Sequence, residues 1–395
     1  MSEPKKAAEI RALSGARALP PLILVLFHFC EGHGYRGLPW FDLIAAKGYL
    51  WVEFFFALSG FILMHVYGSR AQDFARRNGY LSFLRTRLVR LYPLHLFMIF
   101  AIFAQLVLFD WLAAIGGYVS IFHQPYHPQL TLPTFIANLF LVQAWNLFPY
   151  LSWNGVAWFV SVEFLLCLLF PLYLLASHKG GLVRGILLIA LGVCGLTALD
   201  LTSRHGLDLT FHDGIWRGMS AFGVGVGLER VFRATRGAVS HFPDLAHSLL
   251  QVAVTAWLLS AIWFTGWSHT HRDIWTVLPM FALVFVLAFD RGFLVDLLGS
   301  RRFRTLGDWS YATYIGQTFW LQFFRFAEQR VFPDPNAIVF GRRWVELFWW
   351  PEPLLLVAVC TIWGASLTAL FERPARDGLN RLLSGSAAPR AASSA

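Results

Sequence analysis

The sequence predicts an all-α membrane protein, a polytopic bundle of about ten transmembrane helices. Of its 395 residues, 57% are hydrophobic and 14% are charged, whereas soluble domains usually contain about 25% charged residues. The mean hydropathy is +0.55. A soluble fold of this composition would expose large apolar patches to water, so we expect most of the apolar surface to face lipid.

Ten stretches are long and apolar enough to cross a hydrocarbon core of about 30 Å, which takes roughly 20 helical residues. They are 13–31, 48–67, 91–114, 155–176, 182–200, 213–231, 246–265, 273–290, 309–330 and 348–371. The stretch 132–149 is also apolar, but prolines bracket it. We expect an interfacial or re-entrant helix there rather than an eleventh span, because ten spans give the better charge distribution.

The basic residues gather on one side of these ten spans. The long connection 115–154, which would lie outside, contains no Lys or Arg at all. Because loops rich in Lys and Arg stay on the cytoplasmic side, we predict that both termini are cytoplasmic. The predicted organisation is a cytoplasmic segment 1–12, a transmembrane domain 13–372 and a cytoplasmic, largely disordered tail 373–395.

Two classes of ligand are not expected. The net charge is +9, but the basic residues form short clusters between apolar runs. They make no continuous basic face, so we expect no nucleic-acid partner. The four cysteines show neither a CxxC nor a Cys/His metal spacing, and we expect no disulfide framework and no metal site.

The first span carries two polar residues, Arg17 and His28, that are costly in lipid. They are eleven residues apart, which is about 16 Å and about three turns of a helix. Arg17 should therefore lie near the inner side and His28 in the outer half, on similar faces. Pro20 and Pro21 lie between them and should distort the helix. The pair can serve the function of the protein. Alternatively, Arg17 extends its charged end to the membrane surface and His28 is a core residue bonded to a neighbour.

Carboxylates occur in the second and fourth spans, at Glu53 and Glu163. Counting along the spans gives Glu163 a depth comparable to that of His28. The carboxylate could then orient the imidazole as an acid/base pair. A structural ion pair between Glu163 and Arg217 explains the same pattern equally well.

An arginine cluster precedes Pro93, where Arg85, Arg87 and Arg90 fall at the predicted membrane surface. Guanidinium groups bind phosphates in a bidentate manner, so the cluster suits a phosphorylated ligand. Ordinary positive-inside charge is the alternative interpretation.

Taken together, these segments resemble the membrane acyltransferase family 3. Six segments carry the resemblance, in the family's order: LSGARALPPLILVLFHF (13–29), YLWVEFFFALSGFIL (49–63), FLRTRLVRLYPLH (83–95), WFVSVEFLLCLLFPL (158–172), LGDWSYATYIGQ (306–317) and FERPAR (371–376). They span nearly the whole chain. Three departures are Gln317, where the family often has His, Glu53, where Asp is more usual, and Phe164, where a second acidic residue after Glu163 is missing.

The resemblance implies an enzyme that moves an acyl group, acetyl or similar, from acyl-CoA to a hydroxyl group of a saccharide, lipid or natural product. Acyl-CoA is then a co-substrate, and no bound cofactor or metal is expected. His28 would be the general base or carry a transient acyl group, Arg17 would position the donor, and Glu163 would orient His28. Arg87 and Arg90 would bind the acyl-CoA phosphates. Supporting residues in the motifs are Glu53, Ser59, Ser161, Tyr311 and Tyr314.

Two other classes of function remain open at this point. Buried charge in a ten-span bundle also suits a transporter or flippase for a lipid-linked or small substrate, although no internal repeat is seen. A non-catalytic scaffold of the same fold is the third interpretation, which Gln317 leaves open. The expected location is the plasma membrane of a bacterium.

Overall fold

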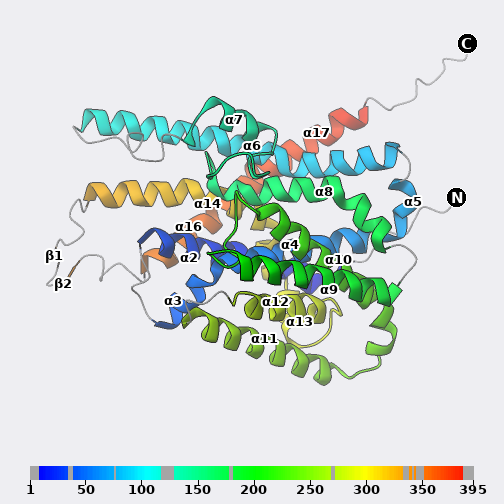
Figure 1. The fold of residues 1–395 in the computed structure, drawn as a ribbon. Coiled ribbons are helices and arrows are strands. Elements are labelled where there is room, and N and C mark those ends of the chain that lie inside the picture. The colour runs from blue at the N-terminus through cyan, green and yellow to red at the C-terminus, as the bar shows by residue number, and fades with distance from the viewer. Residues whose placement is uncertain are drawn as a thin grey trace, which may run out of the picture.

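The computed structural model describes residues 9–33, 39–74, 77–116, 129–177, 181–267, 272–331, 338–339, 342–343 and 351–385. Long helices run side by side through the whole molecule (Figure 1). The strands β1 (Ile338–Val339) and β2 (Arg342–Arg343) pair as a small antiparallel hairpin. The hairpin lies at one end of the bundle, and the short helix α5 (Ala71–Phe74) lies at the other (Figure 1).

The predicted all-helical architecture is confirmed, and the described residues of each of the ten predicted stretches are largely helical. The helices that form the bundle are α1 (Arg11–Ala16), α2 (Leu19–His33), α4 (Trp51–Tyr67), α6 (Arg77–Ile115), α8 (Trp158–Ser177), α9 (Gly181–Thr202), α10 (Gly214–Val239), α11 (Asp244–Trp267), α12 (Ile274–Leu287), α14 (Arg301–Val331) and α16 (Pro351–Leu367). The remaining helical pieces are α3 (Pro39–Ala46), η1 (Gly48–Leu50), η2 (Gly68–Arg70), α7 (Leu132–Leu139), η5 (Gly155–Ala157), α13 (Phe293–Leu298), η6 (Thr368–Glu372) and α17 (Arg373–Gly385).

Within the described residues, seven helices are long and apolar enough to cross a membrane. The other three predicted spans correspond to α10, α12 and α14. The helix α12 has only 14 residues, and α10 and α14 carry polar side chains that they bury against protein, such as Arg217 and Gln317. The chain is thus a multi-pass membrane protein, while the count of ten spans and the cytoplasmic side of the termini stay predictions.

Two smaller predictions concern the segments beside the spans. The stretch 132–149 contains only the eight-residue helix α7, which at 1.5 Å per residue covers about 12 Å and is too short to span a bilayer. The tail differs from the prediction, because residues 373–385 form the helix α17 rather than a disordered segment. Its apolar and charged residues fall on opposite faces, and the helix contacts α6 and η6. Residues 386–395 of the predicted tail lie outside the described residues.

The predicted distortion of the first span is confirmed as a break between α1 and α2. Pro20 and Pro21 have no backbone N–H, so the carbonyls of Ala16 and Arg17 lose their helical partners. The helix α1 ends at Ala16, with Arg17 as its C-cap residue. Arg17 therefore lies at the break, and its side chain lines the cavity described below.

Glycines bring α10 into close contact with its neighbours. A Cβ atom on Gly225 would collide with the Ala57 carbonyl of α4, and one on Gly60 would collide with the Phe222 carbonyl of α10. The glycine-rich run at 223–227 therefore serves helix packing, as its place inside a span predicts. This tight contact fixes α4, which carries two of the predicted site residues.

Candidate active site

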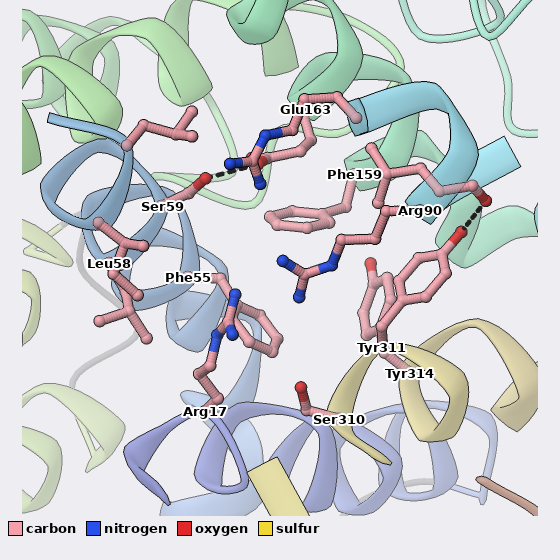
Figure 2. A pocket seen from close by; sticks show the side chains of 14 residues that line it. Arg17, Phe55, Leu58, Ser59, Arg90, Phe159, Glu163, Ser310, Tyr311 and Tyr314 are labelled. Carbon is pink, nitrogen blue, oxygen red and sulfur yellow. Dashed lines mark hydrogen bonds between the residues drawn. The ribbon is translucent and has the colours of Figure 1, made fainter. Parts of the chain in front are cut away.

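Five segments that are distant in the sequence meet around one cavity of about 80 Å³ (Figure 2). They are the α1–α2 break, α4, α6, α8 and α14. The cavity is lined by the polar residues Arg17, Ser59, Arg87, Arg90, Glu163, Ser310, Tyr311 and Tyr314, and by the apolar residues Phe55, Leu58, Ile62, Leu63, Leu91 and Phe159. One water molecule needs about 10–15 Å³ of such space, so the cavity holds several waters or a small part of a ligand.

Three arginines give the cavity a cationic character. Figure 2 shows Arg17 and Arg90 with their guanidinium groups directed into it from opposite sides. Within the described part of the chain, neither these two nor Arg87 forms a salt bridge with a carboxylate, and the buried Nε of Arg87 has no hydrogen-bond partner. Like charges repel strongly at low dielectric constant, so this arrangement favours an anion in the cavity.

Among the described residues, Glu163 is the one carboxylate that lines the cavity. The Ser59 hydroxyl donates to its Oε1 at 2.5 Å, and its charged neighbours are Arg87, Arg90 and Arg17. The predicted pairing of Glu163 with His28 is wrong, since the two side chains have different partners. Similar depth along two helices does not fix the direction of a side chain, and Glu163 faces α4 and the arginines.

An aromatic layer closes the cavity on the side towards His28. The ring centroids of Phe55 and Phe159 are 5.5 Å apart, those of Phe159 and Tyr314 are 5.5 Å apart, and those of Phe55 and Tyr314 are 6.3 Å apart. These separations are favourable for aromatic pairs. Each ring lies about one helical turn from a polar cavity residue, as Phe159 does from Glu163. The polar and aromatic layers therefore follow each other along the bundle axis.

His28 lies beyond the aromatic layer and does not line the cavity. Its Nδ1 is 3.0 Å from Oε1 of Gln317, on α14. The Gln317 side chain is fully buried, and its Nε2 donates to the carbonyl of Tyr314 at 2.9 Å. Asp208, in the connection between α9 and α10, is a charged neighbour of the ring. Tyr314 and Gln317 thus connect the cavity wall to His28.

Arg217 pairs with Glu53 rather than with Glu163. The two side chains are fully buried, and Nη2 of Arg217 donates to Glu53 Oε2 at 2.8 Å and to the Tyr49 carbonyl at 2.8 Å. Glu53 is consequently part of a structural ion pair between α4 and α10. The alternative of an ion pair was right for Arg217 but assigned it the wrong carboxylate.

Three further predicted residues hold neighbouring backbone in place. The Ser161 hydroxyl donates to the Leu141 carbonyl at 2.7 Å, which fixes the segment after α7 and keeps this side chain out of the cavity. The hydroxyl of Tyr311 donates to the Leu91 carbonyl at 2.5 Å, and that of Tyr314 to the Val156 carbonyl at 2.7 Å. Both tyrosines line the cavity while joining α14 to α6 and to η5.

Comparison with known proteins identifies the family. The sequence profile described as "Acyltransferase domain" matches residues 10–370. The chain belongs to the acyltransferase 3 family. A relative described as "Protein 2 in picA locus" from Rhizobium radiobacter is 31% identical over 160 residues, which is 36% of this chain and 78% of that protein. No solved structure matches at a significant level.

Membership makes this chain an acyl-transferring enzyme of the membrane, as its motifs predicted, rather than the transporter that buried charge alone also allowed. The acyltransferase brings together Arg17, Arg87, Arg90, Glu163, Ser59, Tyr311 and Tyr314 around its cavity. It keeps His28, Glu53 and Ser161 apart from them.

Sequence reasoning missed Phe55, Phe159 and Ser310 as cavity residues and missed the partner of His28. The spacing of these residues along their helices indicates that each lies on the same face as a residue of a motif. Ser310, Tyr314 and Gln317 are spaced i, i+4 and i+7, which places them on one face of α14. Phe55 precedes Ser59, and Phe159 precedes Glu163, by four residues. The residues one turn before Ser59 and Glu163 on the same helix faces are thus the ones that form the aromatic layer.

Proposed function

We propose that this acyltransferase transfers a short acyl group, acetyl or similar, from acyl-CoA to a hydroxyl group of a saccharide, lipid or natural product. The donor enters from the cytoplasm and the acceptor from the opposite side of the plasma membrane of a bacterium. The single observation that carries the proposal is a cavity of three arginines that form no salt bridge within the described residues, with an aromatic layer between this cavity and the His28 ring.

The cationic cavity suits the phosphate groups of coenzyme A. Arg90 and Arg17 direct their guanidinium groups into the same space, and Arg87 is a charged neighbour of both. A phosphate neutralises their mutual repulsion and accepts several charge-assisted hydrogen bonds at once. Neither hydrocarbon chains nor a neutral metabolite supplies comparable compensation for these charges.

The separation of the arginines from His28 suits the remaining part of the donor. Eleven residues separate Arg17 from His28, which corresponds to about 16 Å along a helix. The pantetheine arm is long, thin and largely uncharged, so it can pass between the rings of Phe55, Phe159 and Tyr314 when these side chains move apart. The thioester then reaches the His28 ring while the phosphates stay with the arginines.

The reaction follows from this placement. His28 takes the proton of the acceptor hydroxyl while the oxygen attacks the thioester carbonyl carbon. The tetrahedral intermediate collapses, the carbon–sulfur bond breaks, and the coenzyme A thiolate takes the proton from the imidazolium. The products are an ester and free coenzyme A thiol. In a variant of this scheme, His28 itself attacks the thioester and carries the acyl group briefly. Both schemes operate without a metal or a bound cofactor.

The role proposed for Glu163 changes with the structure. Its carboxylate lies among the arginines and is held by Ser59, so it balances part of their charge when no donor is bound. Arg17 acts in donor binding, in accord with its place at the helix break.

A single substitution tests the proposal. His28→Ala should abolish release of coenzyme A thiol in detergent and O-acylation of the producing cell's glycans or lipids, because a general base contributes about 10²–10⁴-fold. His212→Ala, at an exposed side chain, is the control and should be as active as the wild type. Normal acylation by a well-folded His28→Ala protein would refute the assignment of the base.

A further inference from the structure

We infer that Gln317 is a positioning residue that holds the proton of the His28 ring on Nδ1 and thereby leaves Nε2 as the nitrogen that works on the substrate. The inference rests on the proposed function of His28. It also gives a role to the residue at which this chain departs from the histidine frequent in the family.

The orientation of the Gln317 amide follows from its second partner. One end of the amide lies 2.9 Å from the Tyr314 carbonyl oxygen. Since a carbonyl oxygen only accepts, this end must be the NH₂ group. The reversed amide would place two oxygens against each other in a buried position, where Gln317 is 0% exposed. The other end, 3.0 Å from His28, is therefore the amide oxygen.

The proton on the ring follows from the amide. An amide oxygen accepts and never donates, so Nδ1 of His28 must carry hydrogen. The carbonyl of Leu24, one turn earlier in α2, is a second acceptor close to the ring, and it likewise favours a ring nitrogen that carries hydrogen. Nδ1 is the ring nitrogen nearest to the helix backbone, and it is the one within reach of such a carbonyl.

Fixing the hydrogen on Nδ1 determines what the ring can do. The neutral imidazole then has its lone pair on Nε2, the nitrogen that points away from the helix. A hydroxyl proton, or the carbonyl carbon of a thioester, must approach this nitrogen. In the other tautomer Nε2 carries hydrogen, and the ring can neither take a proton nor attack from that side.

Glutamine is well suited to hold this tautomer, because its amide oxygen can only accept a hydrogen bond and its amide group does not ionise. A histidine at position 317 could donate or accept and could gain a charge, whereas the amide stays neutral. With its NH₂ group engaged by Tyr314, Gln317 can only accept from His28. The two buried hydrogen bonds also hold the side chain in one rotamer, and so fix the ring plane.

Two substitutions separate this role from a structural one. Gln317→Met keeps the side-chain volume and removes both hydrogen bonds. Gln317→Glu keeps an oxygen acceptor for His28 but loses the donor to Tyr314. The control is Gln105→Met, which removes a buried amide that donates to the Phe319 carbonyl on the same helix α14, with no contact to His28. Folding is checked by thermal unfolding and gel filtration in detergent.

We expect Gln317→Met to lower kcat about 10–100-fold at an unchanged KM for acyl-CoA, and Gln105→Met to keep the wild-type kcat. Gln317→Glu should recover most of the activity, with the acid limb of its rate profile moved upwards by about one pH unit or more, since a carboxylate stabilises imidazolium. Among the described residues, Asp208 also acts on the ring by its charge, and it is unchanged in all variants.

The outcomes distinguish this inference from the proposed function. If Gln317→Met is as active as the wild type while His28→Ala is inactive, the role of Gln317 is overturned and the base assignment stands. If Gln317→Glu is as inactive as Gln317→Met at every pH, the bond to Tyr314 matters rather than the tautomer. Full activity of His28→Ala would remove the basis of both proposals.

Discussion

Two sets of arginine lie within this bundle, and they differ in burial and in the partners that the chain provides for them. Arg217 is fully buried and has its charge matched by Glu53, with the Leu209 and Tyr49 carbonyls as further acceptors. Arg17, Arg87 and Arg90 lie together around the cavity, where Glu163 is the one lining carboxylate and is bound to Ser59. In the sequence, Arg217 and Arg17 are charges within predicted spans, whereas Arg87 and Arg90 form a cluster just before one.

The difference in partners distinguishes an arginine that stabilises the fold from arginines that can bind a ligand. A charge whose partners all lie within the chain is satisfied in the empty protein, and its removal leaves the partner carboxylate unpaired. A cluster of three positive charges that neighbouring carboxylates balance only in part is less stable empty than occupied, because an anion relieves the remaining repulsion. The contrast predicts that mutations of the first set change stability, and those of the second set change donor binding.

The largest effect is expected at the paired arginine. Arg217→Met should lower the free energy of unfolding by about 3–5 kcal/mol, because Glu53 would remain buried without a counter-ion. Thermal unfolding in detergent measures the loss. The double variant Glu53→Leu/Arg217→Met should recover part of the stability, since no unpaired charge is left, although the Leu209 and Tyr49 carbonyls lose their donor. If Arg217→Met is as stable as the wild type, the pairing with Glu53 does not stabilise the fold, and the contrast between the two sets of arginine is wrong.

A smaller effect is expected at the unpaired arginines. Arg90→Gln should raise the KM for acyl-CoA about 10–100-fold with little change in kcat, as expected for the loss of a charged hydrogen bond of about 1.5–3 kcal/mol. The melting temperature should not fall, because one of three like charges is removed. Initial rates at varied acyl-CoA concentration give both constants.

The neighbouring arginine Arg85 supplies a matched control for Arg90. It lies five residues earlier on α6, but it is exposed and donates to the Leu383 carbonyl rather than lining the cavity. Arg85→Gln should leave the KM for acyl-CoA unchanged. Equal increases in both variants would mean that the general positive charge of this surface, and not the cavity, attracts the donor.

The sequence was sufficient to predict the helices, the family and the arginines, for physical reasons that are visible in single residues. Apolar runs of about 20 residues have one stable solution in lipid, and Pro20 and Pro21 can only break a helix where they stand. The contact between His28 and Gln317 joins residues 289 positions apart, and no local pattern signals it. Similarly, depth alone suggested Glu163 for His28 and left the side-chain direction open. Only the packing of α4, α8 and α14 determines that direction.

The smallest effect is expected at Glu163, the carboxylate that lines the cavity beside the three arginines. Glu163→Gln keeps an oxygen for the Ser59 hydroxyl but removes the one negative charge that lines the cavity. An anionic donor then meets three uncompensated arginines, so the KM for acyl-CoA should fall by a factor of about two to five, with kcat changed less than twofold. The same initial-rate measurements detect this, with Ser59→Ala as the control for loss of the hydrogen bond alone. A collapse of kcat as complete as that of His28→Ala would instead mean that Glu163 reaches the histidine during turnover, and that donor binding rearranges the aromatic layer between them.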